Sequence, residues 1–166
     1  MSDEAQKQEW VGRLDAAEER LHRHAEATKP PGLTDADPET GERWEAGEVW
    51  AHVAEFVPYW TTQLRALFEA YHGEPVPFGR TRTDPDRIGA IERDRDVAPG
   101  ELYDRAAASI EEFRSWVPTW GEREFSARAM HSRLGEMDLR AVVERFVVGH
   151  LEEHADQLDG LVTISG

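Results

Sequence analysis

The chain has 166 residues and a formal net charge of −15, and 32% of its residues are charged; this length predicts a single domain spanning residues 1–166. The acidic balance argues against nucleic-acid and membrane partners, which are bound by clustered Lys and Arg, and the absence of Cys excludes disulfides and thiolate metal ligands. No apolar run approaches the ~18 residues needed to span a bilayer, and the acidic start MSDEAQKQEW does not resemble a signal peptide, so we expect a cytoplasmic protein.

Helical periodicity dominates the first half of the chain. Residues 3–27 carry apolar side chains at three- and four-residue spacing, which predicts a long helix that ends before a pair of prolines. A polar loop over 33–46 follows, and the same spacing predicts a second long helix over 47–71. Residues 73–85 are rich in Gly, Pro and Thr and are expected to form a loop.

The second half repeats this pattern of helices and loops. An Asp-Pro pair predicts a short helix over 84–94, and another proline opens a third long helix over 99–117. Residues 120–136 are expected to form an irregular loop, briefly extended over 124–130, before a capping Asp opens a fourth long helix over 138–159. Four long helices, sizeable connections and no convincing strand predict an all-α fold, a four-helix bundle with long crossover loops.

Three histidines lie on the predicted core-facing stripes of these helices. His150 and His154 are four residues apart on the fourth long helix, so their side chains are neighbours and can chelate one ion. His52 lies three residues after Val49 and four before Phe56, on the apolar stripe of the second helix. A single inward histidine is usually a hydrogen-bonded core residue, but three on facing helices predict a metal site. Imidazole ligands suit zinc, nickel, copper or iron, and three of them leave a further position for water or substrate.

Other polar residues are candidates for the surroundings of this site. Glu55 and Glu153 each follow a histidine by three residues and could orient an imidazole or act as a general base, the alternative being a solvated glutamate. Glu55 is the better candidate for a catalytic residue because its neighbours are apolar. His131 could line the mouth of the site. Arg80 and Arg82 could bind an anionic substrate group, the alternative being a solvated loop.

The stretches GEVWAHVAEFVPYW and LGEMDLRAVVERFVVGHLEEHADQL resemble the DinB/YfiT-like superfamily, and the likeness covers nearly the whole chain in order. The resemblance implies a four-helix bundle in up-down-down-up order and a divalent ion, often nickel or zinc. His52, His150 and His154 fall on the three ligand positions of the family. Analogy with the family also implies a homodimer.

The resemblance implies several activities on a small-molecule substrate. Some relatives are transferases and isomerases that use mycothiol or bacillithiol, including the mycothiol-dependent maleylpyruvate isomerases. The C-terminal domain of those isomerases has no counterpart in the sequence up to Gly166, so we do not expect that activity.

Our leading hypothesis is a metal-dependent S-transferase that activates a small thiol of this type as its cofactor, with Glu55 handling protons. The alternatives are a hydrolase that uses metal-bound hydroxide and a non-catalytic, stress-associated metal-binding protein.

Overall fold

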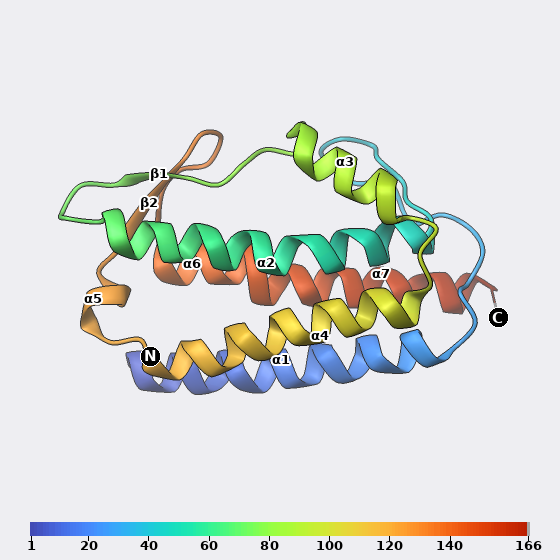
Figure 1. The fold of residues 1–166 in the computed structure, drawn as a ribbon, viewed down its shortest axis with the longest axis horizontal. Helices are drawn as coiled ribbons and strands as arrows, with labels where there is room; N and C mark the ends of the chain where they lie inside the picture. Colours follow the sequence, from blue (N-terminus) through green and yellow to red (C-terminus); the bar gives the residue numbers. More distant parts are fainter. Residues whose placement is uncertain (166) are drawn as a thin grey trace.

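The structure is a computed structural model that describes residues 1–165, with side chains to residue 162; Gly166 lies outside the described residues. The chain is mostly helical and carries one small sheet (Figure 1). The helical elements are α1 (Asp3–Glu26), α2 (Ala46–Ala70), α3 (Pro85–Asp94), α4 (Pro99–Trp116), the 3-10 turn η1 (Val117–Thr119), α5 (Glu122–Phe125), α6 (Leu139–Val143), the π-helical turn η2 (Glu144–Val148) and α7 (Gly149–Ser165). The strands are β1 (Val76–Phe78), β2 (Arg128–His131) and β3 (Gly135–Asp138).

Four long helical segments lie alongside one another in Figure 1. In that view α1 and the C-terminal segment α6–α7 run from left to right, whereas α2 and α4 run from right to left. The short helix α3 and the small sheet lie on the outer side of α2. None of the helices in the described part of the chain is both long and apolar enough to cross a bilayer.

The predicted helices are confirmed to within a few residues at most ends. Asp84 caps α3, since its side chain accepts hydrogen bonds from the amides of Asp86 and Arg87. Asp138 caps α6 in the same way, accepting from the Ala141 amide. The fourth predicted helix was expected to end near residue 159, but α7 continues to Ser165.

The prediction that the chain has no strands is wrong, because the structure contains a three-stranded sheet. β1 pairs in parallel with β2, and β2 pairs antiparallel with β3. The strands have three or four residues each, too few to show an alternating pattern that separates a strand from a loop. The extended stretch expected over 124–130 is shifted, because residues 122–125 form α5 and extended backbone begins at Arg128.

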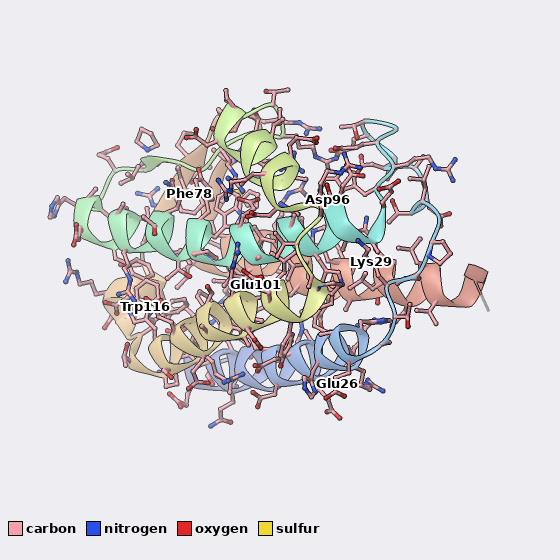
Figure 2. All side chains as sticks on the ribbon, turned by 45° about the vertical axis from the view of Figure 1, so that its right-hand side comes forward. Glu26, Lys29, Phe78, Asp96, Glu101 and Trp116 are labelled. Atoms are coloured by element: carbon pink, nitrogen blue, oxygen red, sulfur yellow. The ribbon has the colours of Figure 1, made fainter. Side chains whose placement is uncertain are left out.

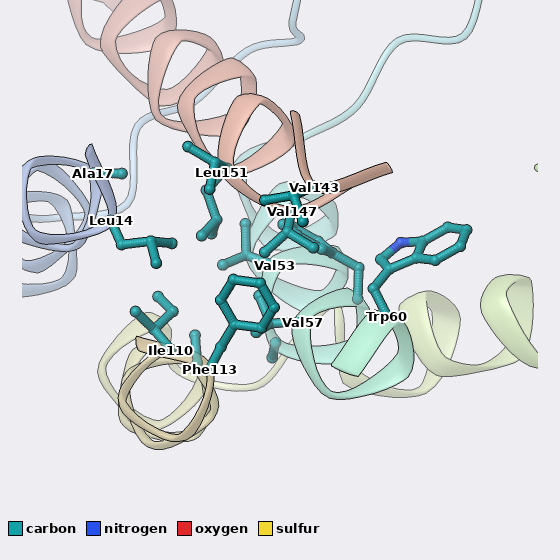
Figure 3. Close-up of a cluster of buried hydrophobic side chains, with 14 of the residues drawn as sticks. Leu14, Ala17, Val53, Val57, Trp60, Ile110, Phe113, Val143, Val147 and Leu151 are labelled. Carbon is teal, nitrogen blue, oxygen red and sulfur yellow. The ribbon is translucent and has the colours of Figure 1, made fainter. Parts of the chain in front are cut away.

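The core lies between the four long helical segments. Figure 3 shows apolar side chains from all of them gathered between the helices, with the Trp60 ring turned away from the rest. Those labelled are Leu14, Ala17, Val53, Val57, Trp60, Ile110, Phe113, Val143, Val147 and Leu151, all buried. Burying one Val, Leu or Phe side chain stabilises a fold by roughly 1.5–3 kcal/mol. Figure 2 labels several charged residues, among them Glu26, Lys29 and Glu101, whose side chains are exposed. This core fixes the faces of α2 and α7 that carry the histidines.

Candidate metal centre

The three predicted histidines meet in space. His52 comes from α2, and His150 and His154 come from α7, which packs against α2. The Nε2 atom of His150 lies 2.9 Å from Nε2 of His52 and 3.1 Å from Nε2 of His154. One ligand atom from each residue lies within 4.8 Å of the others, so this group could hold a metal ion.

Each imidazole also has an oxygen acceptor on its other nitrogen, three residues further along its own helix. His52 Nδ1 lies 2.7 Å from Glu55 Oε1, and His154 Nδ1 lies 2.7 Å from Gln157 Oε1. His150 Nδ1 lies 3.2 Å from Glu153 Oε2. An oxygen acceptor assigns the ring proton to Nδ1 and leaves Nε2 with a lone pair.

With the ring protons on Nδ1, the three Nε2 atoms form a site that fits a cation. Three Nε2 lone pairs that face one another at about hydrogen-bond distance repel, because none of them carries a proton to share. A divalent ion removes the repulsion by accepting all three lone pairs, and hydrogen bonds from the far nitrogen are how metal-binding imidazoles are oriented in proteins. The donor set therefore fits zinc, nickel or a similar ion.

Burial keeps these imidazoles neutral. His52 is 3% exposed and His154 is 4% exposed, and burial, followed by the neighbouring histidines, holds the pKa of both well below its usual range. The side chain of His150 is 25% exposed, and burial lowers its pKa as well. Neutral imidazole is the form that binds metal.

The lowered pKa values predict how the metal-free chain responds to acid. The unfolded chain takes up protons on these histidines near pH ~6.5, whereas the folded chain takes them up only at lower pH. The folded state then binds fewer protons, so its stability falls as the pH drops below about 6.5. Urea unfolding of the metal-free protein between about pH 7.5 and pH 5.5 should show a falling midpoint. The variant with all three histidines replaced by glutamine should lose most of this slope; an equal slope in both proteins would contradict the prediction.

The helix that carries His150 and His154 contains a turn that the spacing did not predict. Residues 144–148 form a π-helical turn, η2, closed by a hydrogen bond from the Gly149 amide to the Glu144 carbonyl. A π turn holds one residue more than an α turn, so the buried face shifts: Val147 and Val148 are buried, whereas Phe146 is only partly buried. Regular α-helical spacing from Val142 and Val143 would instead place Phe146 on the buried face of this helix. The shift leaves His150 at the edge of the core, where it faces a pocket.

Glu55 lies behind His52 and is held by a buried arginine. Arg80 binds both carboxylate oxygens, at 2.6 and 2.7 Å, and its guanidinium lies 3.8 Å from the centre of the Tyr59 ring. Burial raises the pKa of Glu55, although the charge of Arg80 opposes this. Because the carboxylate contacts Nδ1 of His52, it lies on the opposite side of the ring from the converging Nε2 atoms.

Three other residues considered from the sequence, Arg80, Arg82 and His131, line the pocket and differ in their exposure and contacts. The side chain of Arg80 is 7% exposed, so the alternative of a solvated loop is wrong for it. The side chain of Arg82 is 37% exposed and pairs with Asp37. His131 is buried at the pocket wall, and its Nε2 lies 3.0 Å from the Arg80 carbonyl oxygen. We assign His131 to holding the loop that carries Arg80.

A pocket of about 630 Å³ opens onto the three histidines. Its walls include Trp44, Trp60 and Phe146. The Trp44 ring is stacked near His154 with 6.0 Å between ring centres, and the Trp60 ring is stacked on Phe146 at 4.1 Å. Sequence reasoning missed two residues of this region, Gln157 and Arg87; only the spacing of Gln157 from His154 could have indicated the former.

A mostly helical chain that gathers three neutral imidazoles from two helices beside an aromatic-walled pocket defines a candidate metal-binding helical protein. The sequence model of the DinB superfamily matches residues 13–158. The chain therefore belongs to the DinB superfamily, as the resemblance implied. No curated protein and no solved structure matches it.

Proposed function

We propose that the chain is a metal-dependent enzyme that activates a small thiol of the mycothiol or bacillithiol type for transfer to an electrophilic substrate. The observation that carries the proposal is the convergence of three Nε2 atoms beside an accessible pocket. Three protein ligands leave a position open for a further ligand, as in catalytic rather than structural sites. A divalent ion bound there would supply a Lewis acid that lowers the pKa of a bound thiol. The chain has no Cys, so the thiol comes from outside.

The residues around the histidines have positioning roles in this proposal. Glu55 and Gln157 hold His52 and His154 with Nε2 turned toward the common centre. Arg80 neutralises Glu55 and fixes its carboxylate. We therefore assign Glu55 to orienting His52, in place of the proton transfer expected from the sequence. Its carboxylate becomes available for proton transfer only if the contact with Arg80 opens.

Several further properties enter as proposals by analogy with the family. We interpret the four long helical segments as an up-down-down-up bundle that forms one domain over residues 1–166. We also propose a homodimer and a cytoplasmic location. Sedimentation of the purified protein would test the homodimer.

Thiol consumption tests the proposed activity. Protein loaded with zinc or nickel should conjugate monochlorobimane to mycothiol or bacillithiol, and the rate should fall to background when the metal is removed or His150 is replaced by alanine. Generic ester and amide substrates are tested beside it. Ester or amide cleavage without conjugation would replace the proposal with a hydrolase. No activity of either kind in the loaded protein would replace it with a non-catalytic metal-binding protein.

A further inference from the structure

Arg87 is a charged side chain buried without a carboxylate partner. It lies in the first turn of α3, is 9% exposed and lines the pocket above the histidines. Its Nη1 donates one hydrogen bond, 3.0 Å long, to the Arg82 carbonyl. A guanidinium has five N–H donors, and within the part of the chain that the structure describes no carboxylate lies within ion-pair distance of Arg87. Burying a charged group without a partner is costly, so an unpaired guanidinium facing a pocket points to a ligand.

Other arginines of the same pocket are paired. Arg80 binds Glu55, Arg82 lies 2.8 Å from Asp37, and Arg133 lies 2.9 Å from Glu39. The chain has 34 acidic and 19 basic residues, so carboxylates are not scarce. Of the arginines that line the pocket, Arg87 and Arg145 have no ion pair among the described residues. Arg145 is exposed, whereas Arg87 is buried.

Arg87 is also the positive charge that the three histidines share. The charge of Arg87 contributes to lowering the pKa of His52, His150 and His154 alike. The Trp44 ring lies near both Arg87 and the histidine cluster. The Arg87 guanidinium is 5.4 Å from the centre of this ring, and the His154 ring is stacked near it with 6.0 Å between ring centres. Arg87 and the histidine cluster therefore lie close enough for one small molecule to reach both.

Among the described residues, no carboxylate near this point pairs directly with Arg87: Glu153 lies 3.2 Å from Nδ1 of His150, and Glu42 and Glu55 act on Arg87 only from beyond ion-pair distance. Three neutral imidazoles leave the charge of a divalent ion uncompensated, and Arg87 adds another positive charge. Glu55 is neutralised by Arg80. Glu42, whose Oε1 accepts a 2.6 Å hydrogen bond from the Trp44 indole, is exposed. A carboxylate between Arg87 and the histidines would offset one of these positive charges, and the planar fork of a guanidinium matches a carboxylate.

We infer that Arg87 binds the carboxylate of a small-molecule ligand whose other end reaches the three-histidine site. The ligand is thus a small carboxylic acid, which narrows the substrate class of the proposed function. The inference rests on the proposed function only where it assigns a thiol to the other end of the ligand. Binding of the carboxylate by Arg87 requires neither a thiol nor a metal.

A pair of thiols that differ in one group tests this inference. Calorimetric titration of zinc-loaded protein with 3-mercaptopropionate and with 3-mercaptopropan-1-ol gives the ratio of their dissociation constants. A hydrogen-bonded charge pair is worth about 1.5–3 kcal/mol, so the acid should bind roughly 10- to 100-fold more tightly than the alcohol. In Arg87→Gln the ratio should fall to about one, and in Arg87→Lys, which keeps the charge without the fork, it should be intermediate. The matched control Arg133→Gln, at the same pocket, should keep the ratio of the unaltered protein. Because each ratio is measured within one protein, partial loss of folded molecules does not change it.

The outcomes separate this inference from the proposed function. Equal binding of acid and alcohol by the unaltered protein, or an equal loss of preference in Arg133→Gln, would overturn the role of Arg87. Tighter competition by inorganic phosphate than by acetate would overturn the carboxylate assignment. If neither thiol binds the zinc-loaded protein but propionate shifts the Trp44 indole resonance of the metal-free protein only when Arg87 is present, the thiol proposal fails and the carboxylate site stands.

Discussion

Replacing His150 by alanine should abolish tight binding of zinc and nickel while leaving the helices intact. His150 is the central member of the cluster, since its Nε2 lies within 3.1 Å of both other Nε2 atoms. Loss of an outer partner of a ligand typically costs about 10- to 100-fold in metal affinity, and loss of the ligand itself should cost more. His150 is also the most exposed of the three, so its removal opens no large cavity in the core.

Elemental analysis after gel filtration measures the bound metal, and circular dichroism checks the helices. The variant His72→Ala is a matched control, because His72 is exposed and lies outside the pocket; it should retain the metal content of the unaltered protein. Unchanged metal content in His150→Ala would contradict ligation by this residue and remove the basis of the proposed enzyme.

The sequence predicted the helices and the cluster because both depend on local patterns. Asp84 and Asp138 were predicted as caps, and a cap acts on amides two or three residues away. The convergence of His52 with His154 follows from helical periodicity, because residues on core-facing stripes of packed helices approach one another. Burial of both side chains agrees with that prediction.

The features that the sequence did not predict depend on distant contacts. The parallel pairing of Val76 with Ala129 joins segments that are far apart in the chain, and nothing near either residue indicates it. Arg87 lies in a short polar helix, where a charged residue ordinarily faces solvent, but α3 packs against α2 and Arg87 is buried. Helical spacing therefore could not predict the carboxylate site that we infer at Arg87.

The π turn before His150 is the other feature that periodicity missed, and Gly149 is the residue on which it depends. A Cβ atom added to Gly149 would lie 2.3 Å from the carbonyl oxygen of Glu144, the acceptor that closes η2. Backbone at that distance cannot give way as a flexible side chain can. An alanine there must open the turn or force the helix back to α geometry, which rotates every later side chain by about 100° per residue gained or lost.

We therefore expect Gly149→Ala to affect both stability and metal binding. Such steric strain in a packed region typically costs about 1–3 kcal/mol of unfolding free energy. Rotation of His150 and His154 away from His52 should lower metal affinity by at least the ~10- to 100-fold of a lost outer partner. Urea unfolding of the metal-free protein and calorimetric zinc titration measure the two effects separately.

Gly160 provides the matched control, since it lies in the same helix, α7, and a Cβ atom there would meet nothing within 4 Å. Gly160→Ala should stabilise the chain by roughly 0.5–1 kcal/mol, the usual gain of alanine over glycine in a helix, and leave zinc affinity unchanged. If Gly149→Ala behaved like Gly160→Ala in both measurements, the π turn would not set the positions of His150 and His154. A loss of stability and zinc affinity in Gly149→Ala alone would instead show that this glycine aligns His150 and His154 with His52.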